Sequence, residues 1–157
     1  MKNNLFKRFS SKGFTLIELL IVIAILGILA TAVLVGIDPV DRINSANDSK
    51  VQTDLSTAGR AAEAYTTSHN GVYPEAFATL VASGELKTAP VAPGGYSAYT
   101  VEKLPAACTD AALDCTGINI TGQLKSKKFT GASTPIWRYE SGTGKNCAVV
   151  TAATACP

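Results

Sequence analysis

The residue with the most unusual surroundings in this sequence is Glu18, an acid inside an otherwise apolar segment. It is the only charged residue between Phe14 and Ile37, and it lies near the start of that run. A carboxylate at the centre of a bilayer costs roughly 2.5–3.5 kcal/mol on insertion scales, so such acids are kept for a purpose and usually meet a cation. The segment contains no cation, so we expect the partner on another molecule or at a newly made chain terminus. This favours an assembling subunit over a solitary enzyme.

Four cysteines form the second group of reactive side chains, and all lie in the C-terminal third of the chain. An even number of cysteines beyond a membrane-crossing segment indicates disulfide bonds and an oxidising compartment. Zinc binding is the alternative, but zinc sites favour cysteines two to four residues apart, and neither spacing here fits. Of the three possible pairings we favour the two local ones, and cross-pairing stays open. These local pairs are Cys108–Cys115 and Cys147–Cys156.

The remaining polar candidates favour structural roles over catalytic ones. The single histidine, His69, stands beside an Asn-Gly pair and is interpreted as a helix C-terminal cap rather than a base. No nucleophile elbow, phosphate-cradling loop or zinc-protease motif occurs, so we expect no enzyme, no cofactor and no metal site. Two acids between the first two cysteines are expected to solvate a loop, with calcium binding as the alternative. One lysine cluster is expected to be a solvated face, with DNA capture as the alternative. These residues are Asp110, Asp114, Lys125, Lys127 and Lys128.

Composition describes one globular domain with a basic N-terminal extension. The chain has 157 residues, of which 17% are charged and 46% hydrophobic, which is typical of folded rather than disordered proteins. Its net charge of +2 is unevenly placed, because Lys2, Lys7, Arg8 and Lys12 precede the apolar run without any acid. The nearly neutral remainder provides no electrostatic basis for nucleic-acid binding.

The apolar run at residues 14–37 is long enough to cross a membrane. As a helix it would span roughly 36 Å at about 1.5 Å per residue, and the upstream cations would hold the N-terminus in the cytoplasm. A cleavable secretory signal is the alternative, supported by the small-residue sequence Ala30-Thr31-Ala32. Glu18, the length of the run and the apolar residues beyond that sequence all argue against it.

The sequence Lys12-Gly13-Phe14-Thr15-Leu16-Ile17-Glu18 resembles the class III signal of type IV prepilins. In that family a short basic leader is cut after a glycine, the next residue is N-methylated, and a glutamate follows four residues later. The resemblance therefore implies cleavage between Gly13 and Phe14, methylation of Phe14, and an assembly role for Glu18. It is specific over residues 7–37 and diffuse beyond, where Asn70-Gly71-Val72-Tyr73-Pro74 is similar to a segment after the long helix of many pilins.

The resemblance also implies partners, a location and a function. The partners would be further copies in a helical homopolymer, a prepilin peptidase and N-methyltransferase, an assembly platform with its ATPase, and inner-membrane lipid before assembly. The chain would cross the cytoplasmic membrane once and then enter an extracellular pilus for adhesion, motility or DNA uptake. A pseudopilin of a secretion or competence system is the nearest alternative, and a membrane-tethered enzyme or receptor is a third class. Many pilins also carry a disulfide near the C-terminus, which supports the second bond by analogy.

The expected fold is an α+β pilin fold in which a long N-terminal helix packs on a small antiparallel sheet. Residues 1–13 would be the leader, residues 14–37 the membrane and filament-core segment, and residues 38–157 the head. Pro39 interrupts the apolar run. A second helix is expected over residues 39–69, because Val51, Leu55, Ala58, Ala62 and Tyr65 recur at helical spacing. Asp48, Lys50, Asp54, Arg60 and Glu63 are expected mostly off that face.

The C-terminal half is expected to be a sheet. A short helix is predicted over residues 74–83, followed by a loop at 87–95 and by four strands within 96–157. The strands are predicted at residues 96–103, 117–124, 135–140 and 146–151, with Gly-rich turns between them. The apolar stripe on the second helix would cover one face of this sheet.

Overall fold

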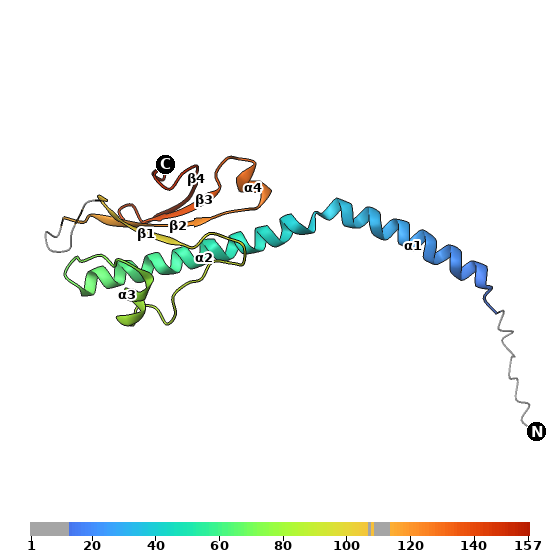
Figure 1. The fold of residues 1–157 in the computed structure, drawn as a ribbon, viewed down its shortest axis with the longest axis horizontal. Coiled ribbons are helices and arrows are strands. Elements are labelled where there is room, and N and C mark those ends of the chain that lie inside the picture. Colours follow the sequence, from blue (N-terminus) through green and yellow to red (C-terminus); the bar gives the residue numbers. More distant parts are fainter. Residues whose placement is uncertain (1–12, 107, 109–113) are drawn as a thin grey trace, which may run out of the picture. The chain divides into compact units, whose positions relative to one another are not determined.

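The computed structural model describes residues 13–106, 108 and 114–157, in two compact units divided after Pro39. Figure 1 shows the helices and strands along the chain. The described part of the first unit is almost entirely one helix, α1 (Leu16–Ile37), and none of its residues is buried. The helix ends at Asp38, which has a left-handed backbone with φ 47°, and Pro39 follows without an amide donor. The two helices therefore meet at Asp38 and Pro39, where the sequence interrupts the apolar run without fixing the position of a bend, and α1 starts at Leu16 rather than Phe14.

The second unit is organised around α2 (Pro39–Ser68), all but the first residue of which lies in this unit. Its buried positions follow helical spacing, and after its end Asn70 and Gly71 take left-handed backbones with φ 53° and 88°. The Asn-Gly pair therefore stops the helix as the sequence indicated. The buried residues of α2 are Asp48, Val51, Leu55, Ala58, Gly59, Ala61 and Ala62.

Four strands form one antiparallel sheet in the order β1-β2-β3-β4, each paired with its neighbour in sequence. Their bounds are β1 (Thr100–Leu104), β2 (Gly117–Gln123), β3 (Ile136–Glu140) and β4 (Lys145–Val149). Ile118, Ile120 and Tyr139 face α2 and form the core with its apolar stripe. Figure 1 shows the sheet lying along α2. The predicted α+β layout, a long interrupted N-terminal helix and a small antiparallel sheet, is confirmed.

Two short helices complete the second unit. The first, α3 (Phe77–Ala82), lies within the predicted range and ends before Gly84, whose φ is 84°. The second, α4 (Lys127–Thr130), was not predicted. Its N-terminal amides bond to side chains of α2: Lys127 N donates to Asp41 Oδ1 at 2.6 Å, and Ser126 N donates to Asp48 Oδ2 at 2.9 Å. The groups that bond to the start of α4 therefore come from residues distant in the sequence. For this reason the sequence around α4 does not itself indicate a helix.

Asp48 corrects one expectation from the sequence. It was placed off the packed face of the second helix, yet it is only 1% exposed. It stands three residues before Val51 and so lies on the same helical face as the apolar stripe. Its carboxylate accepts hydrogen bonds from Tyr96 Oη, Lys125 N and Ser126 N, each at 2.9 Å. Burial of this acid is tolerated because three donors surround it.

Gly59 lets the sheet approach α2 closely. A Cβ at this position would lie 2.5 Å from Cδ1 and Cζ of the Tyr139 ring. We expect Gly59→Ala to destabilise the head by about 1–3 kcal/mol through overpacking, despite the gain of up to about 1 kcal/mol in helix propensity. Thermal unfolding of the full chain in detergent measures the effect. Gly142→Ala is the matched control, because its Cβ would meet nothing within 4 Å. An unchanged or raised melting temperature for Gly59→Ala would contradict this packing.

Three tyrosines donate hydrogen bonds to carboxylates along α2. Tyr96 bonds to Asp48 at 2.9 Å, Tyr99 bonds to Asp54 at 2.8 Å, and Tyr139 bonds to Glu63. Burial raises the pKa of each phenol above its ordinary value, and the hydrogen bond to the carboxylate and the negative charge of that acid raise it further. Each phenol thus holds its proton more tightly in the folded chain than in the unfolded one.

This arrangement predicts a loss of stability in alkali. Because the folded pKa values lie above the unfolded ones, the contribution is fully present below about pH 10 and is lost as the pH rises through the folded values. We expect the melting temperature to fall steadily above about pH 10. Tyr99→Phe should flatten this fall relative to the wild type, because one of the three titrating phenols is gone. Melting temperatures of the two proteins across this pH range test it, and parallel curves would contradict it.

Candidate functional site

The start of α1 is built by Thr15 and Glu18. Thr15 is the N-cap residue, and Glu18 N donates to its Oγ1 at 3.3 Å. In return, the Glu18 carboxylate accepts from Thr15 N at 2.9 Å and from Thr15 Oγ1 at 2.7 Å. This reciprocal arrangement is a capping box, which satisfies two amides that a helix start otherwise leaves unpaired.

The partners of Glu18 in the structure are local. The sequence predicts a cationic partner outside the segment, and no cation bonds to Glu18 among the described residues. The structure instead places three hydrogen-bonding atoms of the same turn around it. The signal was present in the sequence as Thr-x-x-Glu before an apolar run. The free chain therefore holds this carboxylate by local hydrogen bonds.

Gly13 and Phe14 lie before the helix, outside any regular element. Phe14 is 82% exposed, and among the described residues no atom beyond the chain neighbours of Gly13 lies within 4 Å of the position a Cβ on Gly13 would take. The peptide bond between them is two residues from the first residue of α1. Proteases bind extended backbone. The peptide bond between Gly13 and Phe14 is therefore accessible to a protease, whereas a peptide bond inside a helix is not.

The surface of α1 is apolar all round. None of its side chains is buried by other parts of the chain, and its large apolar residues are about half to four-fifths exposed. The helical stretch of residues 16–68 includes a window long and apolar enough to cross a membrane. A helix without a polar face is typical of a segment buried in lipid or among other apolar helices. Glu18 and Thr15 stand at the N-terminal end of this surface.

The cysteines are joined as two local disulfides, Cys108–Cys115 and Cys147–Cys156. The two sulfur atoms of each pair are bonded to one another, so these cysteines provide no thiolate ligand for zinc. Asp114 approaches the first pair, but the sulfurs there are not thiolates and offer no metal ligand. Asp110 lies outside the described residues.

The other sequence candidates have local structural partners. His69 Nδ1 lies 2.9 Å from Tyr65 O in the preceding turn, and its ring stacks on Tyr65 at 3.8 Å, as a C-terminal cap does. Among the lysines, Lys125 donates to Gly95 O and lies over the Tyr96 ring, whereas Lys128 lies over Phe129. The ammonium groups of these two lysines therefore have different partners and do not converge on one ligand site.

A groove of about 420 Å³ lies on the face of the sheet opposite α2, beside the C-terminal segment. Its polar lining comes from the hydroxyls of Ser97, Thr100 and Thr121, the amide of Gln123 and the carboxylate of Glu102. The described lining residues do not include a histidine, cysteine or lysine.

Comparison with known proteins identified one motif, in the N-terminal segment. A family model described as the prokaryotic N-terminal methylation motif matches residues 8–34. Searches of curated proteins and of solved structures gave no match to this chain. The match includes Arg8 and Lys12 before the helix, Gly13, Phe14, the capping box and most of α1, and the motif indicates a structural subunit. The N-terminal segment of this chain is therefore a class III signal of the kind typical of type IV pilins and pseudopilins.

Proposed function

We propose that this chain is the precursor of a structural subunit of a type IV pilus. In this proposal the chain is cut between Gly13 and Phe14, methylated on the new amine of Phe14, and polymerised through α1 into a surface filament. The observation that carries the proposal is the surface of α1, which lies within a class III signal segment for most of its length and is apolar and not covered by the described part of the chain. Such a surface needs lipid while the subunit is stored and needs other apolar helices in the assembled filament. Both environments are apolar, so the transfer between them need not expose α1 to water.

The capping box supports a specific role for Glu18 in this assembly. Cleavage would create a cationic amine on Phe14, one residue before the Thr15 amide that already bonds to the carboxylate. A neighbour's amine at about 4 Å would attract Glu18 by roughly 4 kcal/mol at an effective dielectric of about 20. Thr15 holds the carboxylate at the end of α1 in the meantime, where an incoming amine can reach it. Each helix would then slide along its neighbour until the two charges meet, which fixes the register of the filament.

The proposed partners follow from these steps. A membrane peptidase with methyltransferase activity would act on Gly13 and Phe14, and an assembly platform with its ATPase would extract the subunit from lipid. The basic residues before Gly13 favour a cytoplasmic N-terminus, which places the head on the outer side of the membrane. Two disulfides in the head fit an oxidising compartment on that side. Before assembly the subunit would thus lie in the cytoplasmic membrane.

The proposal is tested by the N-terminus of the mature protein. Mass spectrometry of the chain, isolated from membranes and from sheared surface material, should give a first residue of N-methyl-Phe14 in both fractions. A Gly13→Ala variant should remain uncut and stay in the membrane fraction. Recovery of an active filament whose subunits begin at Met1 would overturn the proposal.

A second experiment separates a pilus from the pseudopilus of a secretion system. In a strain lacking this gene, loss of surface filaments with normal release of exoproteins supports the pilus. Loss of exoprotein release with unchanged surface filaments would assign the chain to a pseudopilus instead.

A further inference from the structure

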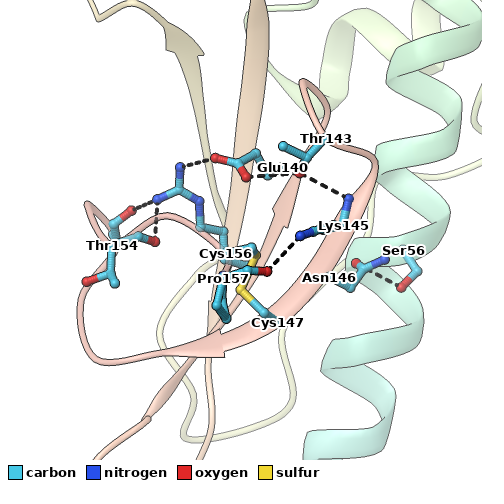
Figure 2. The surroundings of a disulfide bond; sticks show 11 residues. Ser56, Glu140, Thr143, Lys145, Asn146, Cys147, Thr154, Cys156 and Pro157 are labelled. Atoms are coloured by element: carbon cyan, nitrogen blue, oxygen red, sulfur yellow. Dashed lines mark hydrogen bonds and ion pairs between the residues drawn. A yellow bond between two sulfur atoms is a disulfide. The ribbon is translucent and has the colours of Figure 1, made fainter.

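Arg138 is a buried cation on the face of the sheet that points away from α2. It lies in β3 directly opposite Cys147 of β4, and it is 3% exposed. Its Nη2 forms an ion pair with Glu140 Oε1 at 3.0 Å, and Thr143 Oγ1 donates to the other oxygen of that carboxylate at 3.0 Å. Figure 2 shows Glu140 and Thr143 beside the disulfide of Cys147 and Cys156.

The other end of the guanidinium binds the chain between the two cysteines. Arg138 Nη1 donates to Ala152 O at 2.8 Å and to Thr154 O at 2.7 Å. These carbonyls stand four and two residues before Cys156, in the segment that turns back after β4. Both bonds hold this segment over the strand pair, and the Cα atoms of Cys147 and Cys156 are 5.7 Å apart. The returning segment is thus held by a side chain of β3 as well as by the disulfide.

The length of the chain favours this disulfide only modestly. Cys147 and Cys156 are 9 residues apart, whereas cross-pairing with Cys108 or Cys115 would close loops of roughly 30 residues or more. That difference is about two doublings of loop length at about 0.6 kcal/mol of closure entropy each, so chain entropy favours the local bond about tenfold. An interaction that folds the segment before oxidation would add to this preference.

We propose that Arg138 is a positioning residue for the formation of the Cys147–Cys156 disulfide. Its guanidinium gathers the carbonyls of Ala152 and Thr154 while both cysteines are thiols, and so brings Cys156 to Cys147. Glu140 fixes the guanidinium for this task. The proposal assigns to one buried side chain a contribution to the choice of disulfide partner beyond that of chain length, and this contribution is separate from any role of the protein in a filament.

The oxidation itself is ordinary thiol–disulfide exchange with an external disulfide such as oxidised glutathione. One cysteine thiolate attacks that disulfide, forms a mixed disulfide and expels one glutathione thiolate. The other cysteine thiolate then attacks the mixed disulfide, forms the Cys147–Cys156 bond and expels the second glutathione. Two cysteine thiols are oxidised, one glutathione disulfide is reduced to two thiols, and the two protons pass to the released glutathiones. Arg138 contacts no sulfur in this scheme, because it acts on the backbone of the loop.

Oxidative refolding of the full chain in detergent, with reduced and oxidised glutathione, tests the proposal. Arg138→Met should slow native pairing at least about tenfold, the effect of losing one charge-assisted hydrogen bond, and should raise the cross-paired fraction. Arg138→Lys should restore part of the selectivity, because it keeps the charge. Non-reducing digestion and mass spectrometry measure the pairing over time. Lys145→Met is the matched control, since that lysine bonds to Pro157 O, beyond both cysteines, at 2.7 Å. Wild-type rate and pairing in Arg138→Met, with only a lower melting temperature, would overturn the proposal.

A second measurement tests the proposal even if Arg138→Met fails to fold. In the double variant Cys147→Ser with Cys156→Ser, Arg138 is intact and the disulfide is gone. The Thr154 amide, which donates to Thr151 O at 3.1 Å, should remain protected from hydrogen exchange in this variant, because the guanidinium orders the turn without the disulfide. Exchange of this amide at the rate of an unfolded chain would show that the disulfide orders the loop, and the proposal would fail.

Discussion

Replacing Glu18 with leucine is expected to abolish filament formation while leaving the chain processed and anchored in the membrane. The substitution removes the only charge of the apolar segment and both hydrogen bonds from Thr15 to that charge. The lost attraction of roughly 4 kcal/mol would weaken each contact between subunits about a thousandfold. Immunoblots of sheared surface material and of membranes measure the two pools. We expect the variant in the membrane fraction alone.

Glu18→Gln separates the two possible roles of this side chain. Glutamine serves in a capping box as glutamate does, so the start of α1 is preserved while the charge is lost. If pairing with a neighbour's amine drives assembly, the glutamine variant should fail like the leucine variant. If the variant forms filaments at the wild-type level, capping of α1 is what matters, and the proposed ion pair is wrong.

Replacing Asp48 with alanine is expected to unfold the head at a much lower temperature. The carboxylate is the shared acceptor for the Tyr96 hydroxyl and for the amides of Lys125 and Ser126, and its loss leaves these donors without their partner. Breaking such a buried charged network costs about 3–5 kcal/mol. At roughly 2–4 °C per kcal/mol, the melting temperature should fall by about 6–20 °C. Circular dichroism of the full chain in detergent measures the change.

Two further variants define the cause of this loss. Asp48→Asn keeps the shape but presents an amide donor to other donors, so it should recover only part of the stability. Glu102→Gln is the control, because Glu102 is an exposed acid of β1, and we expect a change within about 0.5 kcal/mol. A loss below about 1 kcal/mol for Asp48→Ala would mean that the head is held by its apolar contacts alone.

The features that the sequence predicted are those with local or periodic causes. Pro39 marks the helix break, Asn70 and Gly71 mark the end of α2, and alternating residues mark β2. The apolar stripe from Val51 to Ala62 identified the face that packs on the sheet. In each case the determining residues lie within a few positions of the feature they determine.

The features that were missed depend on distant partners or on a second pattern within the same residues. The short helix α4 receives its capping groups from Asp41 and Asp48 of α2, which no local pattern reveals. Asp48 was misplaced because acids are normally exposed, and only the fold brings donors from two other segments to it. The Thr15–Glu18 capping box has a local signature, but Glu18 also belongs to the apolar run, and the cost of an acid in a membrane predicts a partner on another molecule instead of a cap.

The three tyrosine–carboxylate bonds also determine how the head would resist a pulling force. They join α2 to the rest of the head at Asp48, Asp54 and Glu63, spread along the axis of the helix. Traction along that axis loads all three links in parallel, so they must rupture together rather than one after another. A fibre under tension would therefore pass its load from the helix into the sheet through these phenols, and a single Tyr→Phe change should lower the rupture force measured by single-molecule stretching.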